Sequence, residues 1–317
     1  ISLALADCGE HLLERVPCGG DYELKSAISD YLYRSRGIDA DPERIIIGAG
    51  SEHLYGVIVQ LLGRDTLFAV ENPGYGKISS TYSLNGAKWV AVDVDERGMN
   101  IEKLASVGAD AAHVSPSHQF PTGAVMPVSV RSKLINWAER GERFVIEDDY
   151  DSEFRLFGKP LESTYALCPE KVIYMNTFSK SLAPSMRLGY MVLPAALYEK
   201  YMSLFSTSAN IVPLFEQKAL AAMLNGGHFE RRISRLKNYY RGVRKKLLER
   251  LDGICEVRDT GSGLHVIAKF PQAKDDGEIK AQALSRGVNI RCLSDYLLSP
   301  MEGVEKCAVI NYSGLTL

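Results

Sequence analysis

The chain has 317 residues, of which 46% are hydrophobic, and its 37 basic and 39 acidic residues nearly balance. That length allows one large domain or two of moderate size, and the near-neutral charge gives no general argument for binding nucleic acid or membranes. No apolar run approaches the roughly 18–20 residues needed to span a bilayer, and the N-terminus lacks the basic segment and apolar core of a signal peptide, so a cytoplasmic location is expected.

The first half of the chain alternates between predicted strands and helices. Apolar residues at helical spacing predict a helix over 22–34 that ends near Gly37. Further helices are predicted at 51–62, 77–85 and 128–140, and buried strands at 44–47, 65–70, 88–92, 111–114 and 143–147. This alternation predicts a mainly parallel sheet with helices on both faces, which is an α/β fold.

The second half begins with two short apolar runs and then becomes mainly helical. Strands at 171–175 and 189–193 enclose a polar stretch, and helices are predicted at 195–207, 213–225 and 228–251. A smaller α+β portion follows, with a helix at 277–286 and strands near 254–258, 264–270, 288–292 and 307–312. The chain opens on Ile1 without an initiator methionine, which indicates a piece of a longer protein.

Polar motifs follow the predicted strands at the point where each strand ends. They are GAGSEH at 48–53, ENPGYGK at 71–77, SPSHQFPTG at 115–123, EDDYD at 147–151 and TFSK at 177–180. Ligands of parallel α/β sheets collect at the carboxyl ends of the strands, so we expect one shared site. The glycine turn between strand and helix in the first motif also aims backbone N–H groups at an anion.

The stretch from Thr177 to Tyr190, TFSKSLAPSMRLGY, places a lysine between two buried strands. Its hydroxyl groups and the guanidinium of Arg187 suit a phosphate, because arginine offers a planar fork of donors to the oxygens. A lysine beside a bound phosphate suits a Schiff base, in which the amine condenses with an aldehyde. The residues alone leave open that Lys180 is a solvated lysine in a polar loop.

Three segments, in the same order, resemble motifs of fold-type I pyridoxal 5'-phosphate (PLP) proteins, the aspartate aminotransferase superfamily. The 177–190 stretch resembles the Schiff-base lysine motif. The 115–123 and 145–155 segments are similar to those of MocR/GabR-type regulators of the GntR family, which fuse a winged-helix DNA-binding domain to an aminotransferase-like domain. The resemblance implies that the winged-helix domain lies outside this chain.

The resemblance also implies a domain division and a set of cofactor contacts. Residues 37–206 would form the large PLP-binding α/β domain, and 1–36 with 207–317 the small α+β domain. Lys180 would carry PLP as an internal aldimine. The pyridine nitrogen needs a carboxylate, because a protonated ring is the electron sink of PLP chemistry. The implied contacts are Asp148 at that nitrogen with Asp149 as the alternative, Tyr150 toward the ring hydroxyl, Tyr75 on the ring face, and Ser51, Glu52, Thr177, Ser179 and Arg187 at the phosphate.

Some positions depart from the pattern of the resembled proteins. Lys77 stands where the GabR-like pattern has an arginine for a ligand carboxylate, and lysine lacks the bidentate fork. Phe120 replaces an asparagine that hydrogen-bonds the ring oxygen, and Val309 replaces an arginine for the α-carboxylate. Arg291 is a candidate substitute for that arginine, and Tyr22 is a candidate contact to the partner subunit of a homodimer.

Plainer alternatives remain for several features. Arg187 could form a surface ion pair, Tyr75 could be a turn tyrosine, and the acidic strand end could be solvated. The helix at 228–251 is strongly basic, which suits either a solvated face or a minor role in contacting DNA. The six scattered cysteines include no C-x-x-C pair, so neither zinc nor a disulfide framework is expected.

The sequence therefore predicts a PLP-binding effector domain of a MocR/GabR-type bacterial regulator. The effector would be an amino compound, or PLP itself, acting through aldimine exchange at Lys180. Little multiple-turnover transamination is expected, because Phe120 and Val309 replace two of its supports. The alternative is a catalytic PLP-dependent aminotransferase, and a third class is a dimerisation scaffold without cofactor.

Overall fold

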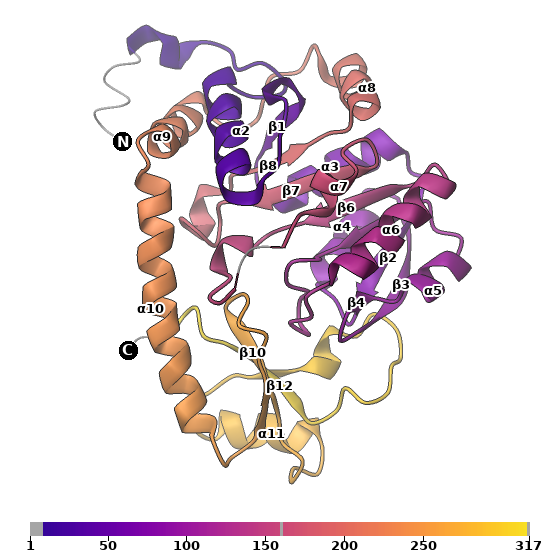
Figure 1. Cartoon of the computed structure of the whole chain (residues 1–317), viewed down its shortest axis with the longest axis vertical. Helices are drawn as coiled ribbons and strands as arrows, with labels where there is room; N and C mark the ends of the chain where they lie inside the picture. Colours follow the sequence, from indigo (N-terminus) through magenta and orange to yellow (C-terminus); the bar gives the residue numbers. More distant parts are fainter. Residues whose placement is uncertain (1–8, 159–160, 316–317) are drawn as a thin grey trace.

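The larger part of the molecule is built on an eight-stranded sheet (Figure 1). The computed structural model describes residues 9–158 and 161–315. The strands are β1 (Ile45–Gly48), β2 (Leu67–Asn72), β3 (Lys88–Asp95), β4 (Gly98–Met99), β5 (Ala111–Val114), β6 (Phe144–Asp148), β7 (Val172–Thr177) and β8 (Gly189–Val192). They are ordered β1-β8-β7-β6-β5-β2-β3-β4, and the neighbours from β7 to β3 run parallel. Because only β8 and the short β4 oppose their neighbours, the prediction of a mainly parallel sheet is confirmed.

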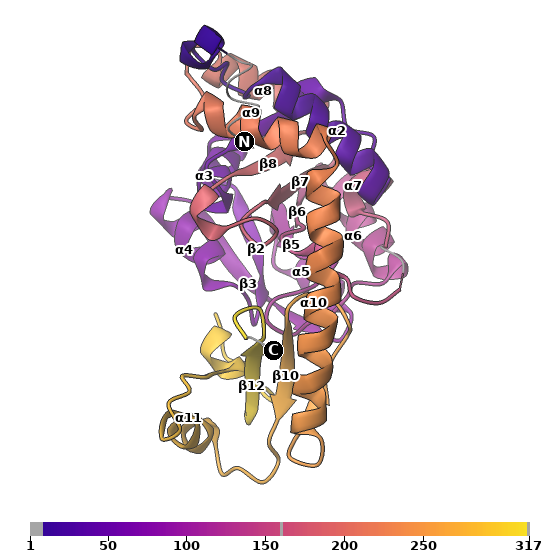
Figure 2. The ribbon, with the colours of Figure 1, turned by 90° about the vertical axis from the view of Figure 1, so that its left-hand side faces the viewer.

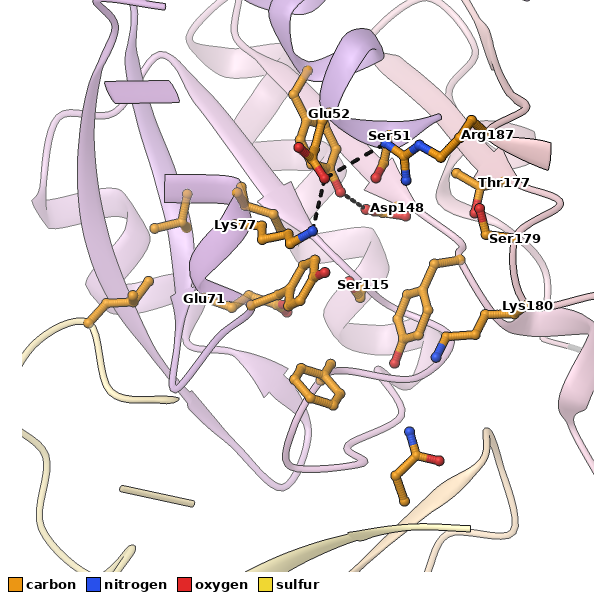
Figure 3. A pocket seen from close by; sticks show the side chains of 18 residues that line it. Ser51, Glu52, Glu71, Lys77, Ser115, Asp148, Thr177, Ser179, Lys180 and Arg187 are labelled. Carbon is orange, nitrogen blue, oxygen red and sulfur yellow. Dashed lines mark hydrogen bonds and ion pairs between the residues drawn. The ribbon is translucent and has the colours of Figure 1, made fainter. Parts of the chain in front are cut away.

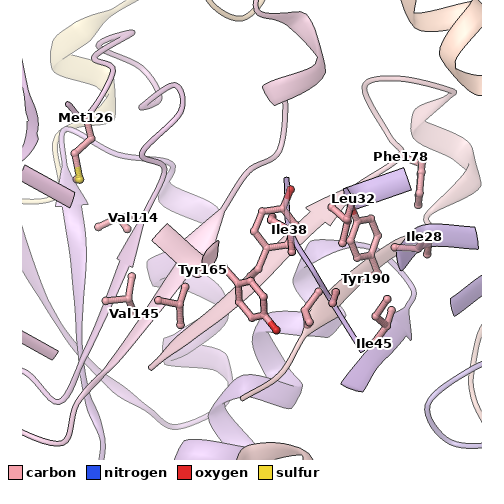
Figure 4. Close-up of a cluster of buried hydrophobic side chains, with 14 of the residues drawn as sticks. Ile28, Leu32, Ile38, Ile45, Val114, Met126, Val145, Tyr165, Phe178 and Tyr190 are labelled. Atoms are coloured by element: carbon pink, nitrogen blue, oxygen red, sulfur yellow. The ribbon is translucent and has the colours of Figure 1, made fainter. Parts of the chain in front are cut away.

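Helices cover both faces of this sheet. On one face, α3 (Ser51–Leu62), α4 (Gly76–Leu84) and α8 (Ala195–Phe205) bury apolar side chains against the strands. On the other face lie α2 (Tyr22–Arg36), α5 (Ile101–Ser106), α6 (Val128–Arg140), α7 (Thr164–Leu167) and α9 (Leu214–Asn225). Figure 4 shows part of this second layer, where Ile28 and Leu32 of α2 lie near Tyr190 of β8. Each fully buried aliphatic side chain of this kind contributes about 1.5–3 kcal/mol.

Helix α2 shows why the local sequence could predict its bounds. At its start, the Asp21 carboxylate accepts a hydrogen bond from the Leu24 N–H at 3.2 Å. At its end, Gly37 takes a left-handed conformation with φ of 65° and donates its N–H back to the last turn. The predicted stop at Gly37 is confirmed.

A four-stranded antiparallel sheet forms the other end of the molecule. Its order is β11-β12-β10-β9, with β9 (Glu256–Arg258), β10 (His265–Lys269), β11 (Arg291–Cys292), β12 (Cys307–Asn311) and the nearby α11 (Asp276–Leu284). Helix α10 (His228–Leu251) runs unbroken from the large sheet to this second one (Figure 2). The strand predicted near 288–292 is reduced to two residues, and α5, α7 and β4 were not predicted because each is too short to show a periodic pattern.

The N-terminal segment contacts both parts of the chain that follow it. Helix α2 packs on α9 and also on β1, and Arg34 Nη2 lies 3.0 Å from Glu230 Oε1 on α10. These contacts join 1–36 to 207–317, as the predicted domain division has it, but α2 also covers the large sheet. The division itself stays a prediction.

Three further observations concern the described residues as a whole. None of their helices combines the length and apolar character needed to cross a bilayer. They contain no group of three His, Cys, Asp or Glu side chains placed to hold a metal ion. Cys8 lies outside the described residues, and the five described cysteines form no disulfide.

A buried ion pair fixes the end of α2 to the large sheet. Arg36 Nε lies 2.9 Å from Asp149 Oδ2, and the two side chains are 7% and 0% exposed. Tyr174 also donates to Asp149, at 2.7 Å. Burial alone would raise the pKa of Asp149, but the charge of Arg36 and hydrogen bonds that include the one from Tyr174 hold this pKa below its ordinary value. The resulting stabilisation is present above the unfolded carboxyl pKa of about 3.9 and is lost as the pH falls through the lower folded value.

We expect Arg36→Met to destabilise the protein by about 3–5 kcal/mol, because it leaves a buried carboxylate unpaired. Urea denaturation at neutral pH measures the change. Arg34→Met is the matched control: its pair with Glu230 is 54% and 38% exposed, and such pairs contribute about 0.2–1 kcal/mol. Equal losses in the two variants would contradict the role of the buried pair.

Candidate functional site

The carboxyl ends of the parallel strands surround a pocket of about 250 Å³ (Figure 3). Residues from motifs far apart in the sequence line it together. Among them are all the predicted cofactor contacts and the predicted carboxylate contact Lys77, namely Ser51, Glu52, Tyr75, Lys77, Asp148, Tyr150, Thr177, Ser179, Lys180 and Arg187. Their roles in binding stay predictions, but the structure brings all ten to one cavity.

One wall of the pocket is the N-terminus of α3, which provides an anion cradle. The first N–H groups of a helix lack intrahelical acceptors and carry the positive end of its dipole. Gly50, just before the helix, has φ of 82°, and a Cβ there would lie 3.1 Å from Arg187 Nη2. A side chain at position 50 would therefore crowd the guanidinium. With Thr177 and Ser179, which lie beside Arg187 in Figure 3, these groups fit a phosphate.

Glu52 links the two cations at the pocket mouth. Its Oε1 lies 2.9 Å from Lys77 Nζ and 3.8 Å from Arg187 Nη2 (Figure 3). The hydrogen bond from Lys77 is the main cause that lowers the pKa of Glu52. All three side chains are well exposed, so a bound anion can compete with Glu52 for either cation.

The side chains at the end of β6 point alternately to the two faces of the sheet. Asp148 enters the pocket, where its Oδ2 accepts a 2.6 Å hydrogen bond from Tyr55. Its Oδ1 is buried and has no hydrogen-bond partner among the described residues. A buried carboxylate oxygen without a donor fits a protonated ring nitrogen. This orphaned oxygen and the anion cradle together match the two ends of PLP.

Glu147 points to the face opposite Asp148, as Asp149 does. Glu147 Oε2 accepts hydrogen bonds from the hydroxyls of Ser163 and Thr164 and from the Tyr165 N–H. The fully buried Arg131 lies 3.8 Å from its other oxygen. Since Asp149 is held by Arg36, Asp148 is the member of the acidic run that lines the pocket. The predicted preference for Asp148 over Asp149 agrees with this placement.

Lys180 projects into the cavity from the link between β7 and β8. Near it, the Tyr150 hydroxyl lies 3.3 Å from His118 Nδ1, which is in turn 2.9 Å from Asp151. Tyr75 meets Phe120 edge-on, with ring centroids 5.9 Å apart, and both rings line the pocket. The ring that replaces the expected asparagine is therefore inside the site.

The basic helix α10 supports the Lys180 loop directly, a contact that the sequence did not reveal. Arg232 donates from Nε to the Ser181 carbonyl at 2.9 Å and from Nη2 to the Leu182 carbonyl at 3.0 Å. Farther along the helix, Arg241 binds the Leu156 carbonyl. The exposed side chains of α10 remain compatible with a solvated face, but these two arginines hold neighbouring loops.

Seven pocket residues were not predicted, among them the apolar Val70 and Ile78. Tyr55 lies one turn after Ser51 on α3, and Ser115 directly follows β5, so spacing could have indicated both. Glu71, at the end of β2, is buried, and burial raises its pKa to about 8. Leu298 and Asn311 come from the C-terminal region, and only the tertiary structure brings them here.

The remaining predicted contacts lie outside the pocket lining. Arg291 pairs with Val309 between β11 and β12, and its guanidinium lies 6.0 Å from the Tyr296 ring centroid. Val309 is buried with Phe120 and Tyr296 in a small apolar cluster. Tyr22 is 59% exposed at the start of α2. The effector role of Arg291 and the partner contact of Tyr22 stay predictions.

Comparison with known proteins agrees with these features. A family model described as aminotransferase class I and II matches residues 6–301. The uncharacterized HTH-type transcriptional regulator YdeL of Bacillus subtilis is 36% identical over 86% of this chain and 60% of its own length. The probable rhizopine catabolism regulatory protein MocR of Rhizobium meliloti is 30% identical over 93% of this chain and 61% of its own. The chain thus spans about three fifths of these relatives.

A solved structure has the same fold. The kynurenine aminotransferase of Pyrococcus horikoshii superposes with a TM-score of 0.85 over 98% of this chain and 81% of that one, at 24% identity. At that identity the likeness concerns the fold, which both the large parallel sheet and the smaller antiparallel sheet follow.

Proposed function

The chain belongs to the aminotransferase class I and II family, and we propose that it is the PLP-binding, effector-sensing domain of a MocR-type bacterial transcription regulator. The cofactor of this family is PLP. The observation that carries the proposal is the pocket itself, where Lys180, the unpartnered Asp148 Oδ1 and the Arg187 cradle meet in a chain whose relatives are named as regulatory proteins.

Each part of the pocket has a distinct task in this proposal. When bound, PLP supplies an aldehyde that condenses reversibly with amines. Lys180 is the resident amine, and a small amino compound that enters the pocket takes its place. Arg187 and the α3 N-terminus hold the phosphate end, Asp148 orients the ring, and Tyr75 covers one ring face. Lys77, freed from Glu52, is the proposed contact for an anionic group of the effector.

Release of Lys180 offers a physical route from the pocket to the rest of the chain. The loop that carries the lysine is held by Arg232 of α10, and Glu230 of the same helix pairs with Arg34 of α2. Helix α2 belongs to the N-terminal segment, on whose upstream side the winged-helix DNA-binding domain of a regulator would lie. A movement of the Lys180 loop could therefore be passed to α2 through the Arg232 contact and the Arg34–Glu230 pair, and from α2 to the DNA-binding domain.

A catalytic aminotransferase is the second candidate, and the presence of all the predicted cofactor contacts in one pocket favours it. Sensing is preferred because two positions that support turnover are apolar. Phe120 lines the pocket without a hydrogen-bonding group, and Val309 is buried among apolar side chains. A scaffold without cofactor is disfavoured by the same set of contacts. We infer that the whole regulator acts on DNA in the bacterial cytoplasm.

We expect the protein reconstituted with PLP to absorb in the visible to near-ultraviolet range, and borohydride to fix the cofactor to Lys180. Peptide mapping after reduction locates the attached residue. Lys180→Ala should abolish attachment. Lys200→Ala should not change it, because the Lys200 side chain lies on the exposed side of α8. Recovery of the reduced cofactor on another lysine of the native protein would disprove the assignment.

Multiple-turnover transamination should be very slow. Losing one oriented hydrogen bond or charge contact costs about 2–4 kcal/mol of transition-state stabilisation, and each 1.4 kcal/mol is about a tenfold loss of rate. Added amino acids should therefore change the PLP spectrum within seconds, while product per protein stays near one when a keto acid is supplied. Turnover at the ordinary rates of about 1–10³ per second would favour the enzyme over the sensor.

We also infer a homodimer, in which Tyr22 reaches the pocket of the partner. Tyr22 is exposed and outside the lining of its own pocket, which leaves it free for such a contact. Sedimentation at micromolar concentration should give twice the monomer mass with PLP bound. A monomer that retains PLP would contradict the inference.

A further inference from the structure

Beneath the pocket, a row of buried polar side chains leads away from Asp148. His113 Nε2 lies 3.6 Å from Asp148 Oδ2, and His113 Nδ1 lies 2.6 Å from the Tyr82 hydroxyl. His113 is 1% exposed and Tyr82 is 0% exposed. Both lie on the α3 and α4 side of the sheet, among apolar side chains such as Phe68, which stacks on Tyr82. Burying a histidine there costs free energy unless its ring nitrogens have polar partners.

The partners of His113 determine where its proton lies. Nε2 is buried, has no hydrogen-bond partner, and faces a carboxylate oxygen that can only accept. A bare Nε2 would place two lone pairs against each other, so Nε2 carries the proton. In the neutral imidazole Nδ1 is then an acceptor, and the Tyr82 hydroxyl donates to it. Asp148 therefore favours the tautomer that presents an N–H to it, and Tyr82 stabilises that tautomer by donating to Nδ1.

The two protein donors approach the same oxygen of Asp148. Tyr55 donates to Oδ2 at 2.6 Å, and His113 Nε2 faces that oxygen from 3.6 Å, which is longer than a hydrogen bond but directs the N–H dipole at the carboxylate. Oδ1 is left without a protein donor. This division keeps one oxygen for the protein and one for a ligand.

We propose that His113, in the tautomer that Tyr82 stabilises, is a positioning residue that supports Asp148 as the partner of the PLP ring nitrogen. An N–H beside Oδ2 complements the charge of the carboxylate and occupies that oxygen together with Tyr55. Oδ1 is then left to accept a hydrogen bond from the ring nitrogen. The inference rests on the proposed contact between Asp148 and the ring, and it adds two residues that do not touch the cofactor.

The alternative is that His113 and Tyr82 only fill space in the core. The two accounts differ in one respect, namely whether the effect of the residues depends on the ring nitrogen. An analogue of PLP with carbon in place of that nitrogen keeps the phosphate, the aldehyde and the shape of the ring. It cannot form the Asp148 contact, so it separates support of Asp148 from packing.

The experiment measures equilibrium affinity for PLP and for the carbon analogue, by fluorescence or absorbance titration of the protein freed of cofactor. The native protein should prefer PLP. His113→Leu should lower the affinity for PLP by at least about tenfold, as expected for loss of a contact to a charged group, and change that for the analogue by less than about threefold. His113→Gln, whose amide keeps an N–H, should restore part of the preference.

Tyr82→Phe is the milder variant, because it removes only the hydroxyl and leaves the ring stacked on Phe68. It should weaken the preference for PLP in the same direction. Tyr190→Phe is the matched control, because this tyrosine is equally buried but lies in the apolar cluster on the opposite face of the sheet. Loss of its hydroxyl should leave the preference for PLP over the carbon analogue unchanged.

The outcomes separate the inference from the function on which it rests. If the native protein binds both cofactors equally, the contact of Asp148 with the ring nitrogen is wrong, and the inference falls with it. If the native protein prefers PLP but the His113 and Tyr82 variants lose both affinities alike, only the inference is overturned. If the variants lose the preference while the control keeps it, His113 supports Asp148 as proposed.

Discussion

The pocket depends on the partition of three consecutive carboxylates at the end of β6. Side chains alternate along a strand, so Glu147 and Asp149 point to one face of the sheet and Asp148 to the other. On the first face, Arg131 and Arg36 compensate the two buried charges. With their charge balanced there, Asp148 can remain in the pocket with one oxygen unpaired by protein.

The parallel arrangement of the strands explains why distant motifs meet. β1, β2, β5, β6 and β7 all end at the same edge of the sheet, and each is followed by residues that line the cavity. The antiparallel β8 pairs with β7, so both ends of the link that carries Lys180, residues 178–188, are fixed to the sheet. Arg232 completes this anchoring from α10, a helix that also reaches the second sheet.

The same cavity could serve catalysis or sensing, because both begin with an amine displacing a lysine. The difference lies in groups that act later, when a bond of the bound amine must be broken and a product released. Here the ring of Phe120 and the side chain of Val309 occupy apolar surroundings at the side of the small sheet. The predicted cofactor contacts thus line one cavity, whereas Phe120 and Val309 provide no polar group at two positions that turnover would use. That imbalance is the physical basis for proposing a sensor.

The sequence by itself determined the α/β class and most element bounds, and the resemblance of its motifs to those of PLP proteins indicated ten residues that line the pocket. It could do so because apolar periodicity and glycine stops are patterns within a single element, as in α2. Polar motifs at the ends of parallel strands also indicate residues that meet at one edge of the sheet. Three short elements escaped it, as did Tyr55, Glu71, Asn311, His113 and Arg232. Only the tertiary structure showed what keeps Asp149 out of the pocket, namely its pair with Arg36, and that α10 holds the Lys180 loop. Those facts depend on which face of a strand is covered and on contacts between segments far apart in the chain, neither of which local patterns record.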